Sequence, residues 1–341
     1  MVLGTLHLAP LPPREGFRLL DAFAAAGGRA VDTAAFYGSG YVESVLGAWL
    51  RRTGAGLRVT TKIGHFGRTA DHRSGPRIEA ALAESVARLG TVPDEVLLHE
   101  GDWACWWDPA AAPGTVGAPP AGTALPAWET LRSLAGREGF TAGLSGNNAG
   151  ALHTTARRTG ASRVLVAKQY DLVWRTAGPL LDDPARSVLL GAPFHQGAVL
   201  DLGALAAGAR RDGDAGLARA ADEAARLLDR HGLSPLDAAV PFVLAERRAA
   251  GVCVGLSGAH EVPDLVRAAG RVLPADLVAA LRRTGVRRAP RPGPGLRPEY
   301  LRPGRDVRPR PLSEDELSED ELSEDEPWQR TPDDEPLATD A

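Results

Sequence analysis

Short apolar runs alternate with longer amphipathic segments along residues 1–285. The amphipathic segments carry apolar residues at helical spacing, as Phe17, Leu20 and Phe23 do in the first of them, which ends at Gly27. The predicted helices cover residues 14–26, 41–52, 77–89, 128–137, 149–159, 217–231 and 235–248. The apolar runs, which we interpret as buried strands, cover residues 2–8, 30–33, 57–63, 95–99, 141–145, 163–170, 187–193 and 252–256.

Strands that alternate with helices predict a parallel sheet in an α/β protein. Eight such units within residues 1–285 match the size of a (β/α)8 TIM barrel, which is the fold class that we predict. The alternative is a doubly wound sheet, which is expected to carry a GxGxxG turn after its first strand. No such turn follows residues 2–8, so the barrel is preferred.

Residues 286–341 differ in composition from the predicted barrel. Residues 287–311 are rich in Pro and Arg, and an acidic pentad then starts at Ser313, Ser318 and Ser323 (SEDEL, SEDEL, SEDEP). The segment from Ser313 to the end carries a net charge of −12, and residues 1–312 carry +8. Like charges at this density oppose compaction, so we predict a disordered C-terminal extension. It is interpreted as a solubility element, with an interaction tail for a protein partner as the alternative.

Composition excludes several classes of protein. There is no apolar run long enough to span a bilayer, and the N-terminus lacks the features of a secretory signal. The two cysteines, Cys105 and Cys253, have no metal-ligand spacing and fit a reducing compartment. Nucleic-acid binding would be indicated by a basic stripe interleaved with aromatic residues, and the sequence has no such stripe. We therefore expect a cytoplasmic protein that binds no metal ion, no membrane and no nucleic acid.

Four polar residues with complementary chemistry fall at the ends of neighbouring predicted strands. Asp32 ends the second strand, Tyr37 follows it, Lys62 ends the third and His99 ends the fourth. The active sites of TIM barrels lie where the strands end, so these side chains should meet. A nearby ammonium group lowers the pKa of a phenol, and Asp32 would neutralise a buried Lys62. Tyr37 would then exchange a proton with a carbonyl or alcohol, and the partner reaction at carbon is most naturally hydride transfer with a nicotinamide.

The motifs around these residues are similar to those of the aldo/keto reductase family. The segment from Asp32 reads DTAAFYGSG, with Glu43 and Leu46-Gly47 behind it, and resembles the family signature. The other matching segments are residues 61–64 (TKIG), 97–99 (LLH), 143–145 (GLS), 168–170 (KQY) and 192–200 (APFHQGAVL). The last of these resembles sugar or aldose-dehydrogenase-like members.

The resemblance implies an NAD(P)-dependent oxidoreductase acting on an aldehyde, a ketone or an alcohol, with a sugar as one candidate. Tyr37 would be the catalytic acid/base, Lys62 and Asp32 would tune it, and His99 would orient the carbonyl. His260 occupies the position where many members have a stronger cation for the 2′-phosphate of NADP, so NADP and NAD both remain open. The residues implied in cofactor binding are Thr5, Ser145, Asn147, Gln169, Pro193, Phe194, Gly197, Gly255, Ser257 and His260.

Other interpretations remain open. Trp103, Trp106 and Trp107 lie in the long loop of residues 101–126, where they would form either an aromatic wall for a substrate or a cover over the barrel rim. A nucleotide-binding regulatory protein on the same barrel is the main rival to an enzyme. A lyase or isomerase without nicotinamide would leave Ser145 and Gln169 unexplained.

Overall fold

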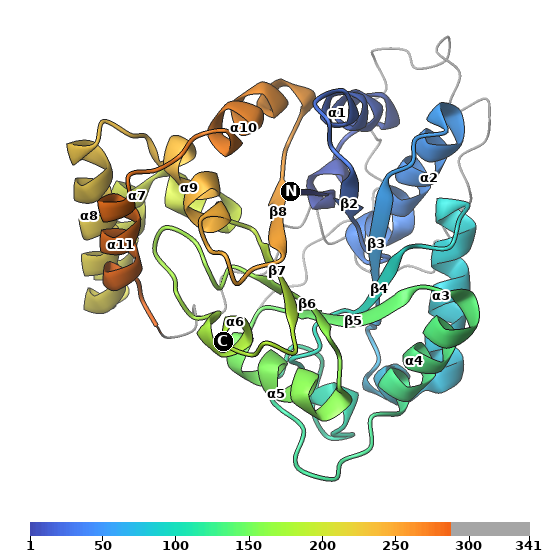
Figure 1. The fold of residues 1–341 in the computed structure, drawn as a ribbon. Helices are drawn as coiled ribbons and strands as arrows, with labels where there is room; N and C mark the ends of the chain where they lie inside the picture. Colours follow the sequence, from blue (N-terminus) through green and yellow to red (C-terminus); the bar gives the residue numbers. More distant parts are fainter. Residues whose placement is uncertain (288–341) are drawn as a thin grey trace, which may run out of the picture. The chain divides into compact units, whose positions relative to one another are not determined.

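A closed barrel of eight parallel strands, paired in sequence order, forms the centre of the computed structural model, which describes residues 1–287 (Figure 1). The strands are β1 (Val2–Gly4), β2 (Ala30–Asp32), β3 (Arg58–Ile63), β4 (Glu95–Leu98), β5 (Thr141–Gly146), β6 (Arg163–Ala167), β7 (Ser187–Gly191) and β8 (Gly251–Gly255). The barrel closes where β8 pairs with β1, with Leu3 opposite Val254. The predicted (β/α)8 fold is confirmed.

Helices surround the barrel (Figure 1). They are α1 (Pro13–Ala25), α2 (Tyr41–Thr53), α3 (Gly75–Leu89), α4 (Pro126–Glu138), α5 (Ala149–Thr159), α6 (Gly178–Leu181), α7 (Leu202–Arg211), α8 (Ala215–Arg230), α9 (Pro235–Leu244), α10 (Val262–Ala269) and α11 (Ala275–Thr284). Several begin with proline in the first turn, where a missing N–H costs nothing. α2, α3 and α4 each end at a glycine in the left-handed conformation, which returns the chain to the next strand.

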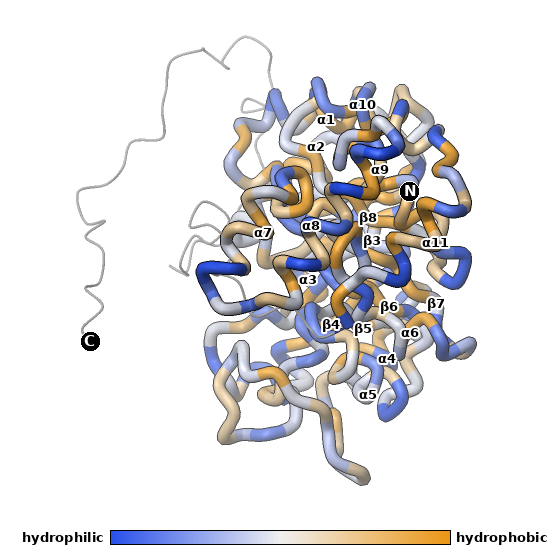
Figure 2. Tube along the Cα trace, turned by 90° about the vertical axis from the view of Figure 1, so that its left-hand side faces the viewer, coloured by the Kyte–Doolittle hydropathy of each residue, from blue (hydrophilic) through white to orange (hydrophobic). Residues whose placement is uncertain are grey.

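The core of the barrel is filled by apolar side chains from several of its strands. Leu97, Leu165, Leu189 and Cys253 form a buried cluster inside it. Figure 2 shows hydrophobic residues along the strands and hydrophilic residues mainly on the outer helix faces and loops. Because the interior is packed, polar side chains can gather only at its ends, and the site described below lies at the carboxyl ends of the strands.

The structure differs from the predicted elements in several places. β1 stops at Gly4 and a 3-10 turn, Leu6–Leu8, follows, whereas the whole run was predicted as a strand. α9 ends at Leu244, before the predicted residue 248. The prediction omitted α7, α10 and α11. Between β6 and β7 the four-residue α6 replaces a full crossover helix.

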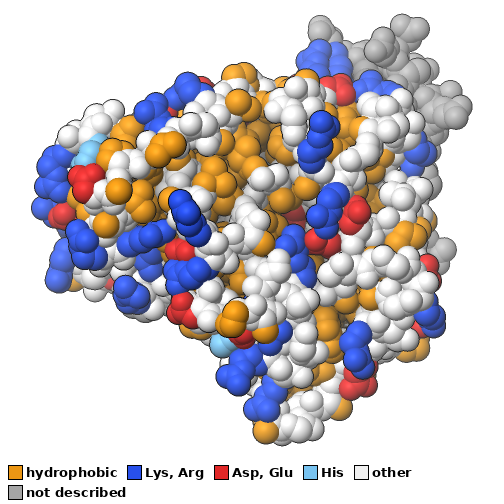
Figure 3. All heavy atoms as spheres, in the orientation of Figure 1, with side chains coloured by type: hydrophobic (Ala, Val, Ile, Leu, Met, Phe, Trp, Pro, Cys, Tyr) orange, Lys and Arg blue, Asp and Glu red, His pale blue; other side chains and the backbone are white. Residues whose placement is uncertain are grey.

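The structure also bears on the predictions from composition. None of the helices in residues 1–287 is long and apolar enough to cross a membrane. Cys105 and Cys253 are buried and not disulfide-bonded. On the face in Figure 3, Lys and Arg side chains are interspersed with acidic and uncharged ones. The expectation of disorder in the acidic extension falls on residues 288–341, outside the described residues.

Candidate active site

The four predicted catalytic residues meet at the carboxyl end of the barrel. Asp32 is the last residue of β2, Lys62 lies near the end of β3, and His99 directly follows β4. Tyr37 begins the 3-10 turn Tyr37–Gly40, which leads into α2. Asp32, Lys62 and His99 are buried, whereas Tyr37 is partly exposed. The phenol therefore lies between solvent and a buried charged pair.

The Lys62 ammonium group links the carboxyl end of β3 to that of β2 and to the turn that follows β2. Its Nζ donates to the Asp32 carboxylate, to the Thr33 carbonyl oxygen at 2.8 Å and to the Tyr37 hydroxyl at 3.0 Å. Burial lowers the pKa of Lys62, but the charges of Asp32 and Tyr37 outweigh this, and the net pKa is raised. Lys62 is therefore a permanent cation whose three N–H groups are all used, which is how a buried ammonium group is tolerated.

The hydroxyl of Tyr37 is held in its protonated form. Burial raises its pKa to about 12, although Lys62 acts in the opposite direction. The expected effect of Lys62 is present, but the expected net lowering of the pKa is not, because desolvation of the phenolate is the larger effect. A protonated phenol that borders the solvent is suited to donate a proton to a substrate oxygen.

His99 is a neutral imidazole next to Tyr37. Burial, followed by the charges of His65 and Lys62, lowers its pKa well below the usual value. Its ring is edge-on to that of Tyr37, with centroids 6.1 Å apart. Within residues 1–287 its buried Nδ1 has no hydrogen-bond partner. A neutral imidazole has one N–H to donate, and a carbonyl oxygen is a suitable acceptor.

Aromatic residues that the sequence analysis did not select also lie beside His99. Phe36 stacks on His65 with ring centroids 3.6 Å apart, and His65 contacts both His99 and Trp103 edge-on. Burial lowers the pKa of His65 to about 4, so this ring is neutral as well. Their positions in the sequence could have indicated this, since Phe36 lies inside the signature segment and His65 lies three residues after Lys62.

The three tryptophans of the long loop have different surroundings. Trp106 is buried, donates from Nε1 to the Glu100 carbonyl oxygen at 2.9 Å and packs against Gly64, so it belongs to the barrel rim. Trp107 is partly exposed and packs near Gly117. Trp103 is partly exposed and contacts His65. Of the three, Trp103 is the one that joins the aromatic residues next to His99.

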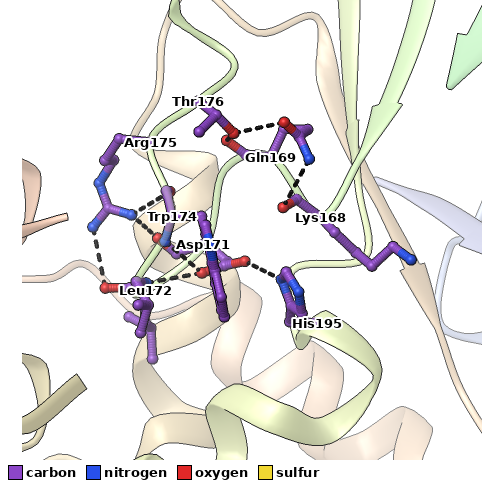
Figure 4. Close-up of polar contacts among 9 residues, drawn as sticks. Lys168, Gln169, Asp171, Leu172, Trp174, Arg175, Thr176 and His195 are labelled. Carbon is purple, nitrogen blue, oxygen red and sulfur yellow. Dashed lines mark hydrogen bonds and ion pairs between the residues drawn. The ribbon is translucent and has the colours of Figure 1, made fainter. Parts of the chain in front are cut away.

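Polar side chains from β5 and the loop after β6 supply amide and hydroxyl groups beside the four residues. Gln169 is held by Thr176, whose hydroxyl donates to Gln169 Oε1 at 2.7 Å (Figure 4). The buried Ser145 hydroxyl donates to the Leu98 carbonyl oxygen at 3.3 Å. Asn147 directs its Nδ2 at Glu100, which leaves its Oδ1 as an acceptor. Thr5 is buried and donates to the Asp32 carbonyl oxygen at 3.0 Å.

These groups fit a nicotinamide cofactor. A carboxamide has both donors and acceptors, and the side chains of Ser145, Asn147 and Gln169 include both kinds of group. The loops after β7 and β8 hold the other predicted cofactor residues. Pro193 is buried, and Phe194, Gly197, Gly255, Ser257 and His260 are partly or fully exposed.

Two acidic residues next to His99 were not selected as site residues. Glu100 has the left-handed backbone conformation (φ 53°) and accepts from Asn147 Nδ2 at 2.9 and 2.8 Å. Asp102 is buried and accepts from the backbone N–H groups of Asn147 and Asn148 at 2.9 and 2.6 Å. Burial and the neighbouring Asp102 raise the pKa of Glu100 to about 7. Both side chains thus fix the turn that carries Asn147.

The loop after β6 has a second polar network (Figure 4). Asp171 accepts from His195 Nδ1 at 2.9 Å, and Trp174 stacks on the His195 ring at 3.9 Å. Arg175 donates to carbonyl oxygens in its own loop and to Leu281 in α11 at 2.8 Å. These contacts join the β6 and β7 loops, which replaces the packing of a long crossover helix.

The sequence matches the model of the aldo/keto reductase family over residues 1–285. The chain belongs to the aldo/keto reductase family. As a member of this family, the protein is an oxidoreductase. Members of the family use nicotinamide cofactors and act on carbonyl substrates. No group of His, Cys, Asp and Glu in residues 1–287 is arranged to hold a metal ion.

Solved structures agree on the fold. An aldo-keto reductase from Bacillus halodurans in its holo form is 19% identical, with a TM-score of 0.64 over 85% of this chain and 93% of that chain. A glycerol dehydrogenase from Gluconobacter oxydans is 20% identical, with a TM-score of 0.60 over 86% of this chain and 94% of that chain. Comparison of the sequence with curated proteins gives no match.

Proposed function

We propose that the protein catalyses reversible hydride transfer between NAD(P) and an aldehyde, ketone or alcohol, with Tyr37 as the general acid/base. The observation that carries this proposal is the position of Lys62 Nζ, which donates both to Asp32 and, at 3.0 Å, to Tyr37. A structural lysine could use buried acceptors for all its N–H groups, whereas here one N–H group donates to a phenol that is partly exposed. The contact with a partly exposed phenol gives the charged pair a role in proton transfer.

Each residue has a defined part in the reaction. A bound nicotinamide supplies the hydride chemistry. Tyr37 donates its proton to the carbonyl oxygen during reduction and accepts one during oxidation. Lys62 stabilises the phenolate left after donation, and Asp32 keeps the lysine charged. His99 donates a hydrogen bond that orients the same oxygen.

The substrate is proposed to be a small neutral carbonyl compound or alcohol with a flat or apolar face. Phe36, His65 and Trp103 present aromatic surfaces next to His99. The face of a sugar ring or an aryl group packs well on such surfaces. The free, buried Cys105 and Cys253 fit a reducing compartment, so we retain the cytoplasm as the proposed location.

A nucleotide-binding regulatory protein is the second candidate. It would need the cofactor residues but not a coupled lysine, phenol and imidazole. The hydrogen bond from Lys62 to Tyr37 therefore favours the enzyme.

Titration of the full chain with NADH and NADPH, followed by nucleotide fluorescence, tests cofactor binding. A panel of aldehydes, ketones and sugars then tests turnover with the nucleotide that binds. We expect binding of at least one nucleotide and turnover of at least one carbonyl compound. Absence of binding at several hundred micromolar would overturn the proposal, and binding without turnover across the panel would favour the regulatory protein.

A further inference from the structure

The loop after β8 carries a carboxylate in a position where barrel enzymes commonly bind phosphate. Such sites use the loops after the seventh and eighth strands and the N-terminus of a short extra helix. Here β8 ends at Gly255, and the chain continues through the 3-10 turn Ala259–Glu261 into α10. If the proposed nicotinamide cofactor binds, this loop is therefore expected to border its adenosine phosphates.

The Glu261 side chain is fixed on the turn that precedes it. Its Oε2 accepts from the Ser257 backbone N–H at 2.7 Å, and its Oε1 accepts from the Ser257 hydroxyl at 2.9 Å. Both carboxylate oxygens are thus held at the start of α10, and both Ser257 donors are engaged. An incoming phosphate would meet a negative charge there, where a helix start would otherwise attract an anion.

Positive charges near this loop are already balanced. Arg267 pairs with Asp237 and, at 3.1 Å, with Asp264. Arg271 lies 3.6 Å from the same Asp237 carboxylate. The remaining group, His260, is an imidazole, which lacks the planar fork of five donors with which a guanidinium holds a phosphate. The loop therefore lacks the strong cation that recognition of a phosphate dianion requires.

We propose that Glu261 makes the cofactor site selective for NAD(H) over NADP(H). The two cofactors differ only at the adenosine ribose, where one has a 2′-hydroxyl and the other a 2′-phosphate. A carboxylate accepts a hydrogen bond from the hydroxyl and repels the phosphate, which is how acidic residues select NAD in other nucleotide-binding folds. This proposal rests on the proposed function, because it assumes that a nicotinamide nucleotide binds.

Equilibrium binding of each nucleotide tests the selectivity without a turnover assay. The full chain, Glu261→Gln and Glu261→Arg are titrated separately with NADH and NADPH, using nucleotide fluorescence. Glu138→Gln, on the exposed end of α4, is the matched control for loss of a surface carboxylate. Thermal unfolding of each variant shows whether it is folded.

In the wild type we expect NADH to bind at least about tenfold more tightly than NADPH, because the Glu261 carboxylate repels the 2′-phosphate. Glu261→Gln should bring the Kd values for NADH and NADPH closer together, mainly through tighter NADPH binding. Glu261→Arg should reverse the preference. Glu138→Gln should leave it unchanged. Wild-type binding of NADPH as tight as that of NADH, or a ratio unaffected in both Glu261 variants, would overturn this proposal alone. Failure of both nucleotides to bind would overturn the proposed function and this proposal with it.

Discussion

Replacing Glu100 with Gln is expected to stabilise the protein at alkaline pH and to have little effect in mild acid. Glu100 has a pKa raised to about 7, because its carboxylate is desolvated and lies near Asp102. The native state therefore binds this proton more tightly than the unfolded chain does. The stabilisation from the proton is complete below the ordinary pKa of 4.5 and is lost as the pH rises through about 7.

The size of the effect follows from the two pKa values. Raising a pKa from 4.5 to about 7 corresponds to at most about 3 kcal/mol, at about 1.4 kcal/mol per pH unit. Partial exposure of Glu100 to solvent reduces this, so we expect about 1–2 kcal/mol. The Gln side chain keeps its shape and one acceptor for Asn147 but does not titrate.

Urea unfolding of the full chain at intervals between about pH 5 and pH 8.5 measures the effect. The free energy of unfolding of Glu100→Gln should be close to that of the wild type near pH 5 and exceed it by about 1–2 kcal/mol at pH 8.5. Glu138→Gln serves as the control with an exposed carboxylate and should give no such trend. A difference that stays constant with pH, or that favours the wild type at pH 8.5, would refute the assignment of a raised pKa to Glu100.

Three further substitutions test other parts of the structure. Lys62→Met should lower kcat at least about 100-fold, because it removes the cation that stabilises the Tyr37 phenolate; a near-normal kcat would contradict this role. Gly47→Ala should lower the free energy of unfolding by about 1–3 kcal/mol in urea titrations, since its Cβ would lie 2.2 Å from the Arg88 carbonyl oxygen; unchanged stability would contradict the packing. Trp103→Ala should raise KM for aryl or sugar substrates severalfold while the Kd for nucleotide is unchanged, and a matching loss of nucleotide affinity would place Trp103 at the cofactor instead.

The sequence predicts the barrel and the four catalytic candidates because both leave local signals. Alternating apolar runs and amphipathic segments reveal the strands, and Lys62 stands out as an ammonium group in an otherwise apolar strand. The structure brings Lys62 into contact with Asp32 and Tyr37, as strand order in a barrel requires.

Features that depend on contacts between distant segments left no such signal. In the loop after β6, Arg175 donates to the Leu281 carbonyl oxygen in α11, and no local sequence pattern indicates a contact between segments so far apart. The raised pKa of Glu100 depends on its burial beside Asp102, which the motif does not reveal. The net pKa of Tyr37 likewise depends on how much desolvation outweighs the Lys62 charge, and only the three-dimensional arrangement gives that balance.

The most direct test of the central claim is single-turnover hydride transfer in Tyr37→Phe, compared with nucleotide binding in the same variant. Tyr41→Phe is the matched control, because the Tyr41 hydroxyl donates to the Leu11 carbonyl oxygen at 2.7 Å, away from Lys62. The account predicts that Tyr37→Phe binds nucleotide like the wild type and transfers hydride at least about 100-fold more slowly, while Tyr41→Phe keeps a normal rate. A Tyr37→Phe protein that transfers hydride at the wild-type rate would contradict the assignment of Tyr37 as the acid/base.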